Sequence, residues 1–276
     1  MLFIRQNTIF FTNQINMDEL RLHPHENERK EMADIILKTG TLLMSAGANT
    51  GRVRTTINRI AEAFGYSVHI QIDQRAIMLT MLDDSGSSIF TVVRVTPHHV
   101  INFRTISGIS KMSWSMVEEQ WSIHDINEEL DRLEQLPRFP RWQVLTLVGL
   151  AGSGFCFLAD GSYLDLTFTF VASFIGLFIR QESLKAHFNP YVSVYFAALV
   201  ASLIAGSASK LGLSDSQNHA FVTSVLFLIP GVPLINAFSD IMDGNVLNGI
   251  TRGFVGFLIS FSIALGILTT ALIYQF

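Results

Sequence analysis

The sequence is poor in cysteine and carries little excess charge. Cys156 is the only cysteine in 276 residues, so the chain can form no internal disulfide and no cysteine-based metal cluster. Cys156 lies in an apolar run, which favours a buried, inert thiol. The net charge is -4, without the basic footprint typical of nucleic-acid binding. We therefore expect no metal, no cofactor and no nucleic-acid partner.

Recognisable catalytic signatures are missing as well. The sequence has no Gly-x-Ser-x-Gly elbow, no phosphate-binding loop and no His-Glu-x-x-His motif. We therefore expect a protein that is not an enzyme and does not bind ATP to drive transport. Arg5 and Asn7 interrupt the first apolar residues, which argues against a signal peptide. Met17 begins a stretch that reads like a natural start, so it is open whether residues 1–16 belong to the natural protein.

Charged residues are concentrated in the first half of the chain. Residues 1–141 hold 15 of the 19 Lys and Arg and 17 of the 23 Asp and Glu. Residues 137–142 read Pro-Arg-Phe-Pro-Arg-Trp, with prolines that stop a helix and a tryptophan suited to the headgroup level of a bilayer. We predict a polar tail over residues 1–27, a soluble α+β domain over 28–137 and a membrane domain over 138–276.

Apolar spacing predicts the elements of the first half. Helices are expected where apolar side chains recur every three to four residues, and strands where they alternate with polar ones. The predicted elements are helices 28–46, 50–64 and 113–135 and strands 68–72, 76–82 and 89–95. Gly47 and Gly65 end the first two helices, and the polar run 83–88 is a hairpin signal. This order indicates a small α+β unit.

The second half reads as an all-α membrane bundle. About 20 apolar residues in a helix cross the ~30 Å hydrocarbon core of a bilayer. Five stretches reach or approach that length, at about 142–159, 162–179, 188–209, 218–238 and 251–273. The expected fold is therefore five transmembrane helices preceded by the small soluble domain.

Charges in the loops indicate the orientation of these spans. If all five stretches cross the membrane, the segments before the first, between the second and third, and before the fifth lie on the same side. These segments carry the positive side chains Arg138, Arg141, Arg180, Lys185 and Arg252. Positive flanks face the cytoplasm. We therefore expect a multi-pass protein of the bacterial cytoplasmic (inner) membrane, with the N-terminal domain in the cytoplasm and the C-terminus outside.

The stretch 226–240 is apolar enough for a membrane, yet it contains helix breakers. Proline lacks the amide that would bond the carbonyl four residues back, so Pro230 and Pro233 each free one carbonyl. At membrane depth such groups are tolerated where they face protein or a water-filled cavity. The stretch is either a kinked packing helix or a broken helix that lines a substrate site.

Polar groups around this break form the candidate site. A helix that restarts after Pro230 and Gly231 would offer unpaired amides and the positive end of its dipole to a carboxylate. The spacing places Pro233, Asn236 and Asp240 on one helix face. Asn236 could bind a polar ligand, and Asp240 could bind an ammonium group or a proton.

Two charged residues of the second span complete the candidates. Arg180 could bind the anionic substrate or pair with Asp240. Asp165, near the other end of that span, is a proton-coupling candidate together with Asp240. Simpler roles stay open, as a residue at the membrane interface for Asp240 and as an exposed carboxylate at a loop end for Asp165.

Four stretches make the chain resemble the threonine/serine exporter (ThrE) family. They are 47–53 (Gly-Ala-Asn-Thr-Gly-Arg-Val), 139–142 (Phe-Pro-Arg-Trp), 178–181 (Phe-Ile-Arg-Gln) and 228–236 (Leu-Ile-Pro-Gly-Val-Pro-Leu-Ile-Asn) with Asp240. Full-length members join a soluble domain to two five-span halves. This chain is similar to the shorter, split branch, which includes a subunit of a bacterial succinate exporter and in which a second membrane protein supplies the other five spans.

The resemblance implies a function in export. It suggests one subunit of a secondary exporter for small carboxylate-bearing metabolites, either threonine and serine or a C4-dicarboxylate such as succinate. The expected partners are that substrate, membrane lipid, and a second five-span subunit or further copies of this chain. The alternative is a membrane-anchored hydrolase or sensor whose activity lies in the N-terminal domain, with Ser45, His69, His98 and His99 among its candidates. The spacing of these residues supports no catalytic triad. Substrate, coupling ion, stoichiometry and the role of the soluble domain stay open.

Overall fold

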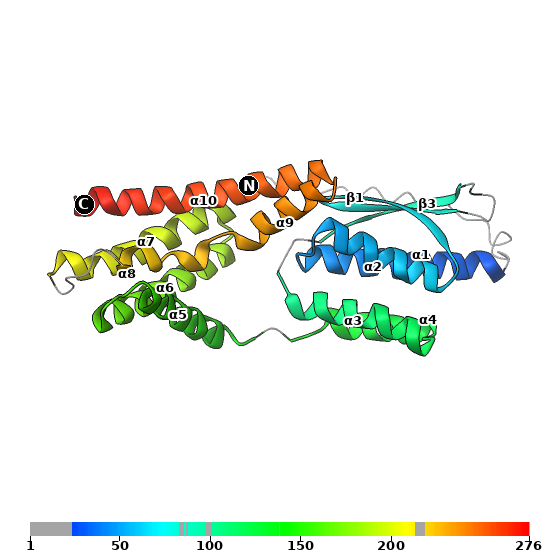
Figure 1. The fold of residues 1–276 in the computed structure, drawn as a ribbon, viewed down its shortest axis with the longest axis horizontal. Coiled ribbons are helices and arrows are strands. Elements are labelled where there is room, and N and C mark those ends of the chain that lie inside the picture. The colour runs from blue at the N-terminus through cyan, green and yellow to red at the C-terminus, as the bar shows by residue number, and fades with distance from the viewer. Residues whose placement is uncertain are drawn as a thin grey trace, which may run out of the picture.

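The structure consists of two halves that follow one another along the chain. This computed structural model describes residues 24–82, 86, 88–97, 101–137, 139–212 and 219–275. Figure 1 shows an N-terminal half (residues 24–137) and a C-terminal half (residues 139–275) placed end to end. Most of the predicted polar tail, the hairpin tip and both His98 and His99 lie outside the described residues.

The N-terminal half is a three-stranded antiparallel sheet covered by helices. Its elements are α1 (Pro24–Ser45), α2 (Thr50–Ala63), β1 (Ser67–Asp73), β2 (Ala76–Leu82), β3 (Ser88–Val95), α3 (Phe103–Glu119) and α4 (Ile123–Glu134). The strand order is β1-β2-β3. Ile77, Leu79 and Met81 of the central strand are fully buried, because alternate side chains of a strand point to one face. Figure 1 shows α1 and α2 between the sheet and the α3–α4 pair.

The predicted helix 113–135 is wrong in extent, because two helices occupy this region. α3 begins ten residues earlier, at Phe103, and Gln120 ends it in a left-handed conformation (φ 53°). Ser122 then starts α4 with a capping box, in which its side chain accepts from the amide of Asp125. The hydrogen bonds that Ser122 donates to Asp125 hold the pKa of that carboxyl below its usual range. Local capping therefore divides one apolar pattern into two helices.

The C-terminal half is entirely helical in its described residues. Its elements are α5 (Arg141–Leu158), α6 (Tyr163–Lys185), α7 (Pro190–Lys210), α8 (His219–Thr223), the 3-10 helix η2 (Leu226–Leu228), α9 (Gly231–Met242) and α10 (Val246–Tyr274). Four helices, α5, α6, α7 and α10, are long and apolar enough to cross a membrane. The segment from α8 to α9 bends by 61° and is either a broken fifth span or a re-entrant loop. The predicted helical bundle is thus confirmed for this half, with four or five apolar segments that could cross a membrane.

Small residues bring α7 and α10 into close contact. A Cβ added at Gly266 would lie 2.7 Å from Cβ of Ala198 and 2.9 Å from the backbone nitrogen of Leu199. The hydroxyls of Ser202 and Thr270 lie 2.7 Å apart in the same contact. In a membrane, close backbone approach and hydroxyl hydrogen bonds hold helices together, because apolar burial between helices contributes little there.

This contact predicts the effect of a larger residue at Gly266. We expect Gly266→Leu to force α7 and α10 apart and to lower the free energy of unfolding by about 1–3 kcal/mol, the usual range for overpacking. The matched control is Gly154→Leu on α5, since no described atom lies within 4 Å of the Cβ that would be added there. Thermal unfolding of the purified protein in detergent measures both. Equal melting temperatures for the two variants would contradict the proposed packing.

Candidate functional site

The predicted helix break at Pro230 is present and has a defined backbone geometry. Pro230 has φ -79° and ψ 55°, which is an inverse γ-turn. The amide of Gly231 donates to the carbonyl of Ile229 at 2.8 Å, and the amide of Ile229 donates to the carbonyl of Leu226 at 3.1 Å. The two carbonyls expected to be freed by the prolines therefore both find donors nearby. The helix is therefore broken between η2 and α9 without leaving these two carbonyls unpaired. We call this break the hinge.

The same bonds limit what the start of α9 can offer to an anion. Gly231 has already donated its amide, and Pro233 has none to donate. Among the first three residues of α9, this leaves the amide of Val232. The dipole of α9 still points its positive end at the break, but the expected set of unpaired amides is reduced.

Asp240, near the end of α9, lies at the contact between the two halves. Its side chain is fully buried. Oδ1 accepts a hydrogen bond of 2.8 Å from the amide of Thr50, the first residue of α2. Oδ2 lies 3.0 Å from Nη1 of Arg252 on α10, so the two side chains form an ion pair. The angles between these two atoms do not meet the geometry of a hydrogen bond. The alternative that Asp240 pairs with Arg180 is wrong.

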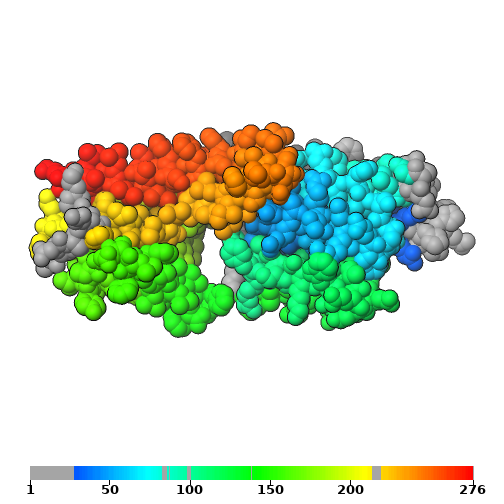
Figure 2. Space-filling view, viewed as in Figure 1, coloured from blue at the N-terminus to red at the C-terminus, as the bar shows by residue number. Residues whose placement is uncertain are grey.

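Asn236, one turn before Asp240, contacts the same part of the N-terminal half. Its Nδ2 donates to the carbonyl of Gly47 at 2.8 Å. Arg252 donates from Nη2 to the carbonyl of Ala48 at 3.1 Å. Asn248 donates to the Thr50 hydroxyl at 3.2 Å and to the carbonyl of Ile72 at 2.7 Å. We call these four residues, Asn236, Asp240, Asn248 and Arg252, the docking network. Figure 2 shows the two halves in contact at α9 and α10, with a gap between them near α5 and α3.

The sequence 47–51 is suited to this contact residue by residue. Gly47 has φ 91°, a conformation that glycine adopts without strain, and it exposes the carbonyl that Asn236 binds. Asn49 caps α2 by accepting from the amide of Arg52 at 2.8 Å. Gly51 leaves room for Asp243, whose Oδ2 would lie 2.6 Å from an added Cβ. A motif that the sequence marks as distinctive thus forms a docking surface.

Arg180 lies elsewhere, beside a large cavity between the halves. The cavity has a volume of about 710 Å³. Arg180 is partly buried and makes no hydrogen bond or ion pair with another described residue. A partly buried cation without a counter-ion costs free energy, which a bound anion would offset. Of the predicted site residues, Arg180 is therefore best placed to bind a carboxylate.

The walls of this cavity come from both halves. The N-terminal half contributes Gln74, Arg75, Val95, Thr96 and Pro97. The C-terminal half contributes Arg180, Pro190, Tyr191, Val194, Thr251, Val255 and Ile259. Two arginines are present, and no aspartate or glutamate is among these lining residues. The lining therefore contains two cations, and it is apolar over much of α7 and α10.

Asp165 lies about 22 Å along α6 from Arg180, at 1.5 Å per residue. It is 2% exposed and accepts at Oδ2 from the amide and hydroxyl of Ser162, at 2.9 and 2.8 Å. This is a capping box at the start of α6. The structure gives Asp165 a local structural role and separates it from Arg180 and Asp240.

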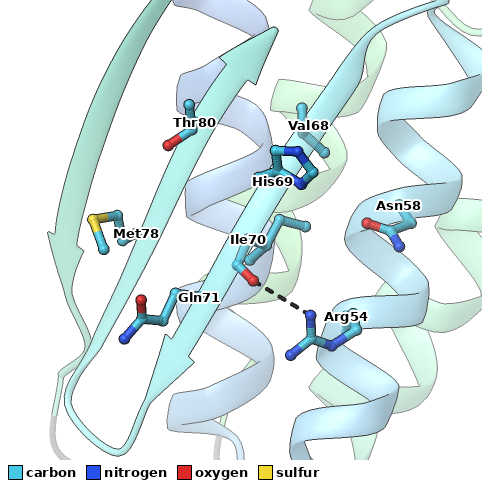
Figure 3. A pocket seen from close by; sticks show the side chains of 8 residues that line it. All are labelled: Arg54, Asn58, Val68, His69, Ile70, Gln71, Met78 and Thr80. Carbon is cyan, nitrogen blue, oxygen red and sulfur yellow. Dashed lines mark hydrogen bonds between the residues drawn. The ribbon is translucent and has the colours of Figure 1, made fainter. Parts of the chain in front are cut away.

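Residues suggested for a hydrolase do not come together in the described structure. Ser45 donates its hydroxyl to the carbonyl of Leu42 at 3.0 Å. His69 lines a separate pocket on the sheet, beside Arg54 and Asn58 (Figure 3), and that pocket contains no Ser, Cys, Asp or Glu. Within the described residues, no group of three or more His, Cys, Asp and Glu is arranged to hold a metal ion.

Sequence reasoning missed several residues of the contact between the halves. Arg252 was interpreted as a flank of the last span, yet it lies inside α10 and is 7% exposed. The turn 243–245 between two apolar runs could have predicted a helical hairpin that brings Asp240 and Arg252 together. Arg75 and Thr96 gave no such signal, because only the fold brings them near Arg180.

Comparisons with known proteins agree with this membrane architecture. The family model described as "Putative threonine/serine exporter" matches residues 34–274. The "Probable succinate transporter subunit YjjP" of Klebsiella aerogenes is 27% identical over 88% of this chain and 93% of that protein. The Escherichia coli protein of the same name is 27% identical over 90% and 96%. The "Threonine/serine exporter" of Corynebacterium glutamicum is 22% identical over 85% of this chain and 49% of its own length. No solved structure matches the chain significantly.

The docking network predicts that neutralising Asp240 loosens the contact between the halves. Asp240→Asn leaves Arg252 buried without a counter-charge, and losing one member of a buried ion pair costs about 3–5 kcal/mol. We expect faster hydrogen exchange at residues 46–53 and a lower melting temperature. The matched control is Asp160→Asn, since Asp160 is an exposed carboxylate that follows α5, away from the docking network. Unchanged exchange in Asp240→Asn would show that Asp240 does not hold α2.

Proposed function

Because the chain belongs to the threonine/serine exporter family, we propose that it is one subunit of a secondary exporter for small carboxylate-bearing metabolites. The candidate substrates are threonine, serine and C4-dicarboxylates such as succinate, as the names of its relatives suggest. The protein is a multi-pass membrane transport protein. The carboxylate class is supported above all by one observation, namely that Arg180 lines the cavity between the halves without a counter-ion.

The proposed topology has five spans, with α8, η2 and α9 together as the fourth. The N-terminal half lies in the cytoplasm, the C-terminus lies outside, and the membrane is the bacterial inner membrane. Support comes from the positive side chains at the ends that face the N-terminal half, where Arg141 and Lys185 both form ion pairs with Glu182. The cavity between the halves then lies at the cytoplasmic side, where an exported metabolite enters.

The proposed export cycle uses the hinge at Pro230. Discontinuous helices line the substrate path in many secondary transporters, and one group of helices rocks against another. In this conformation Asn236 and Asp240 hold the N-terminal half. They become available to a substrate ammonium group or a proton when the halves separate. Pro233 and Gly231 belong to the hinge, and Asp165 is the second proton-coupling candidate, at the outer end.

A second subunit completes the proposed exporter. Two relatives are named as subunits, and this chain matches about half of the Corynebacterium exporter. Large side chains such as Phe254, Phe257 and Leu272 are exposed on α10 and suit contact with lipid or with another helical subunit. Further copies of this chain are the alternative partner.

The cavity predicts a strong effect of replacing Arg180. In a strain lacking the chromosomal copy, we expect Arg180→Gln to lower efflux of every carboxylate substrate about tenfold or more, since a charge-assisted contact is removed. Arg180→Lys keeps the charge and should retain part of the activity. The matched control is Lys185→Gln, an exposed cation at the end of the same helix. Wild-type efflux in Arg180→Gln, measured for succinate, threonine and serine, would contradict the role of Arg180.

The hinge predicts that a continuous helix is inactive. Replacing Pro230 and Pro233 by Ala restores two amide donors and favours a straight helix. We expect efflux to fall about tenfold or more while the protein still folds, because the motion is impaired and the core is intact. Pro140→Ala is the control, since it removes a proline at the start of α5. Normal efflux from the double variant would mean that the break serves packing only.

A further inference from the structure

A second arginine, Arg75 of the N-terminal half, lines the cavity beside Arg180. We propose that Arg75, with the hydroxyl of Thr96, binds the second anionic group of the substrate. The cavity is then a dianion site shared between the two halves, and Arg75 determines preference for two carboxylates over one. This proposal rests on the proposed function, since it assigns the second end of the ligand that Arg180 binds.

Arg75 is held in place although its side chain is exposed. It occupies the tight turn between β1 and β2, where Asp73 pairs with Ala76. The amide of Thr96, just after β3, donates to the carbonyl of Arg75 at 2.8 Å. The side chain of Arg75 makes no hydrogen bond or ion pair with the described residues. The backbone is therefore fixed while the guanidinium stays available at the edge of the cavity.

Thr96 supplies an independent indication of a ligand. Its side chain is 7% exposed and lines the cavity. Its Oγ1 is buried and has no hydrogen-bond partner in the described part of the chain. A buried hydroxyl without a partner is costly, and a rotation of the Thr96 side chain toward the cavity would let it donate to a carboxylate oxygen there. The other threonine of the lining, Thr251, donates to its own helix, at Leu247, at 2.9 Å.

The distribution of charge along the cavity favours a dianion. Arg75 and Arg180 both line it without acidic neighbours in the lining, so an anion that enters would meet two uncompensated cations. The first turn of α7 also contributes Pro190 and Tyr191, which places the positive end of that helix dipole at the wall. Val194, Val255 and Ile259 form an apolar stretch. Two cations and an apolar stretch in one lining suit a short carbon chain that carries two carboxylates.

Binding of succinate and of its monomethyl ester tests the proposal. The ester keeps the carbon chain and removes one negative charge. Labelled forms of both are equilibrated with membrane vesicles that contain the full protein. We expect the wild type to bind succinate about tenfold or more tightly than the ester, because the second carboxylate gains a charge-assisted contact. Arg75→Gln should weaken succinate binding to the level of the ester and leave ester binding unchanged within about twofold. Thr96→Val should change the preference in the same direction by a smaller factor.

The controls separate this proposal from the proposed function. Lys111→Gln removes an exposed cation from the N-terminal half away from the cavity and should bind both ligands like the wild type. Arg180→Gln should weaken both ligands together. If Arg75→Gln keeps the wild-type preference, or weakens both ligands equally, the role of Arg75 is overturned while Arg180 stands. If wild-type vesicles bind neither ligand but bind threonine or serine, the dianion site is overturned while the proposed function stands. If they bind none of these, the proposed function itself is contradicted.

Discussion

A buried carboxylate needs partners, and the arrangement of the two halves follows from how Asp240 finds them. Removing a charge from water costs several kcal/mol, and Asp240 is fully buried. Arg252 supplies the opposite charge from α10, and the start of α2 supplies an amide from the other half of the chain. The carboxylate thereby accepts from the first amide of a helix that lies 190 positions earlier in the sequence. Asn236 and Asn248 satisfy backbone carbonyls around it, so the contact is polar and specific.

The two regions between the halves differ in how their charges are satisfied. In the docking network, Asp240 and Arg252 compensate each other and nearby polar groups complete their surroundings. In the cavity, Arg75 and Arg180 are both cationic and no lining side chain compensates them. The first arrangement stabilises the protein alone, whereas the second would be stabilised by a bound anion. This difference, more than cavity size, supports the assignment of the substrate site to the cavity.

Much of the fold could be predicted from local sequence, whereas the site could not. Pro230 and Pro233 predicted the broken helix, because a proline removes a hydrogen bond from its own helix whatever the rest of the fold is. The strands were evident from alternation, and the capping box at Ser162 could have been read from its spacing to Asp165. The split between α3 and α4 was missed because apolar periodicity continued across it. Asp240 looked like a ligand because its partners lie at Thr50 and Arg252, and only tertiary structure brings them together.

The turn at Pro230, whose neighbouring carbonyls are hydrogen-bonded, also has a mechanical consequence. α9 is a rigid rod of about 18 Å, at 1.5 Å per residue for its 12 residues. One end adjoins the turn at Pro230, Asn236 lies at the middle of the helix and Asp240 lies near the other end, and both contact the N-terminal half. A rotation of roughly 10° at this turn would displace Asp240, which lies about 15 Å from Pro230, by about 2.6 Å. Such a shift exceeds what the hydrogen bond to Thr50 can tolerate. In the proposed export cycle α9 would thus act as a lever, and a small rotation at Pro230 would become engagement or release of the opposite half.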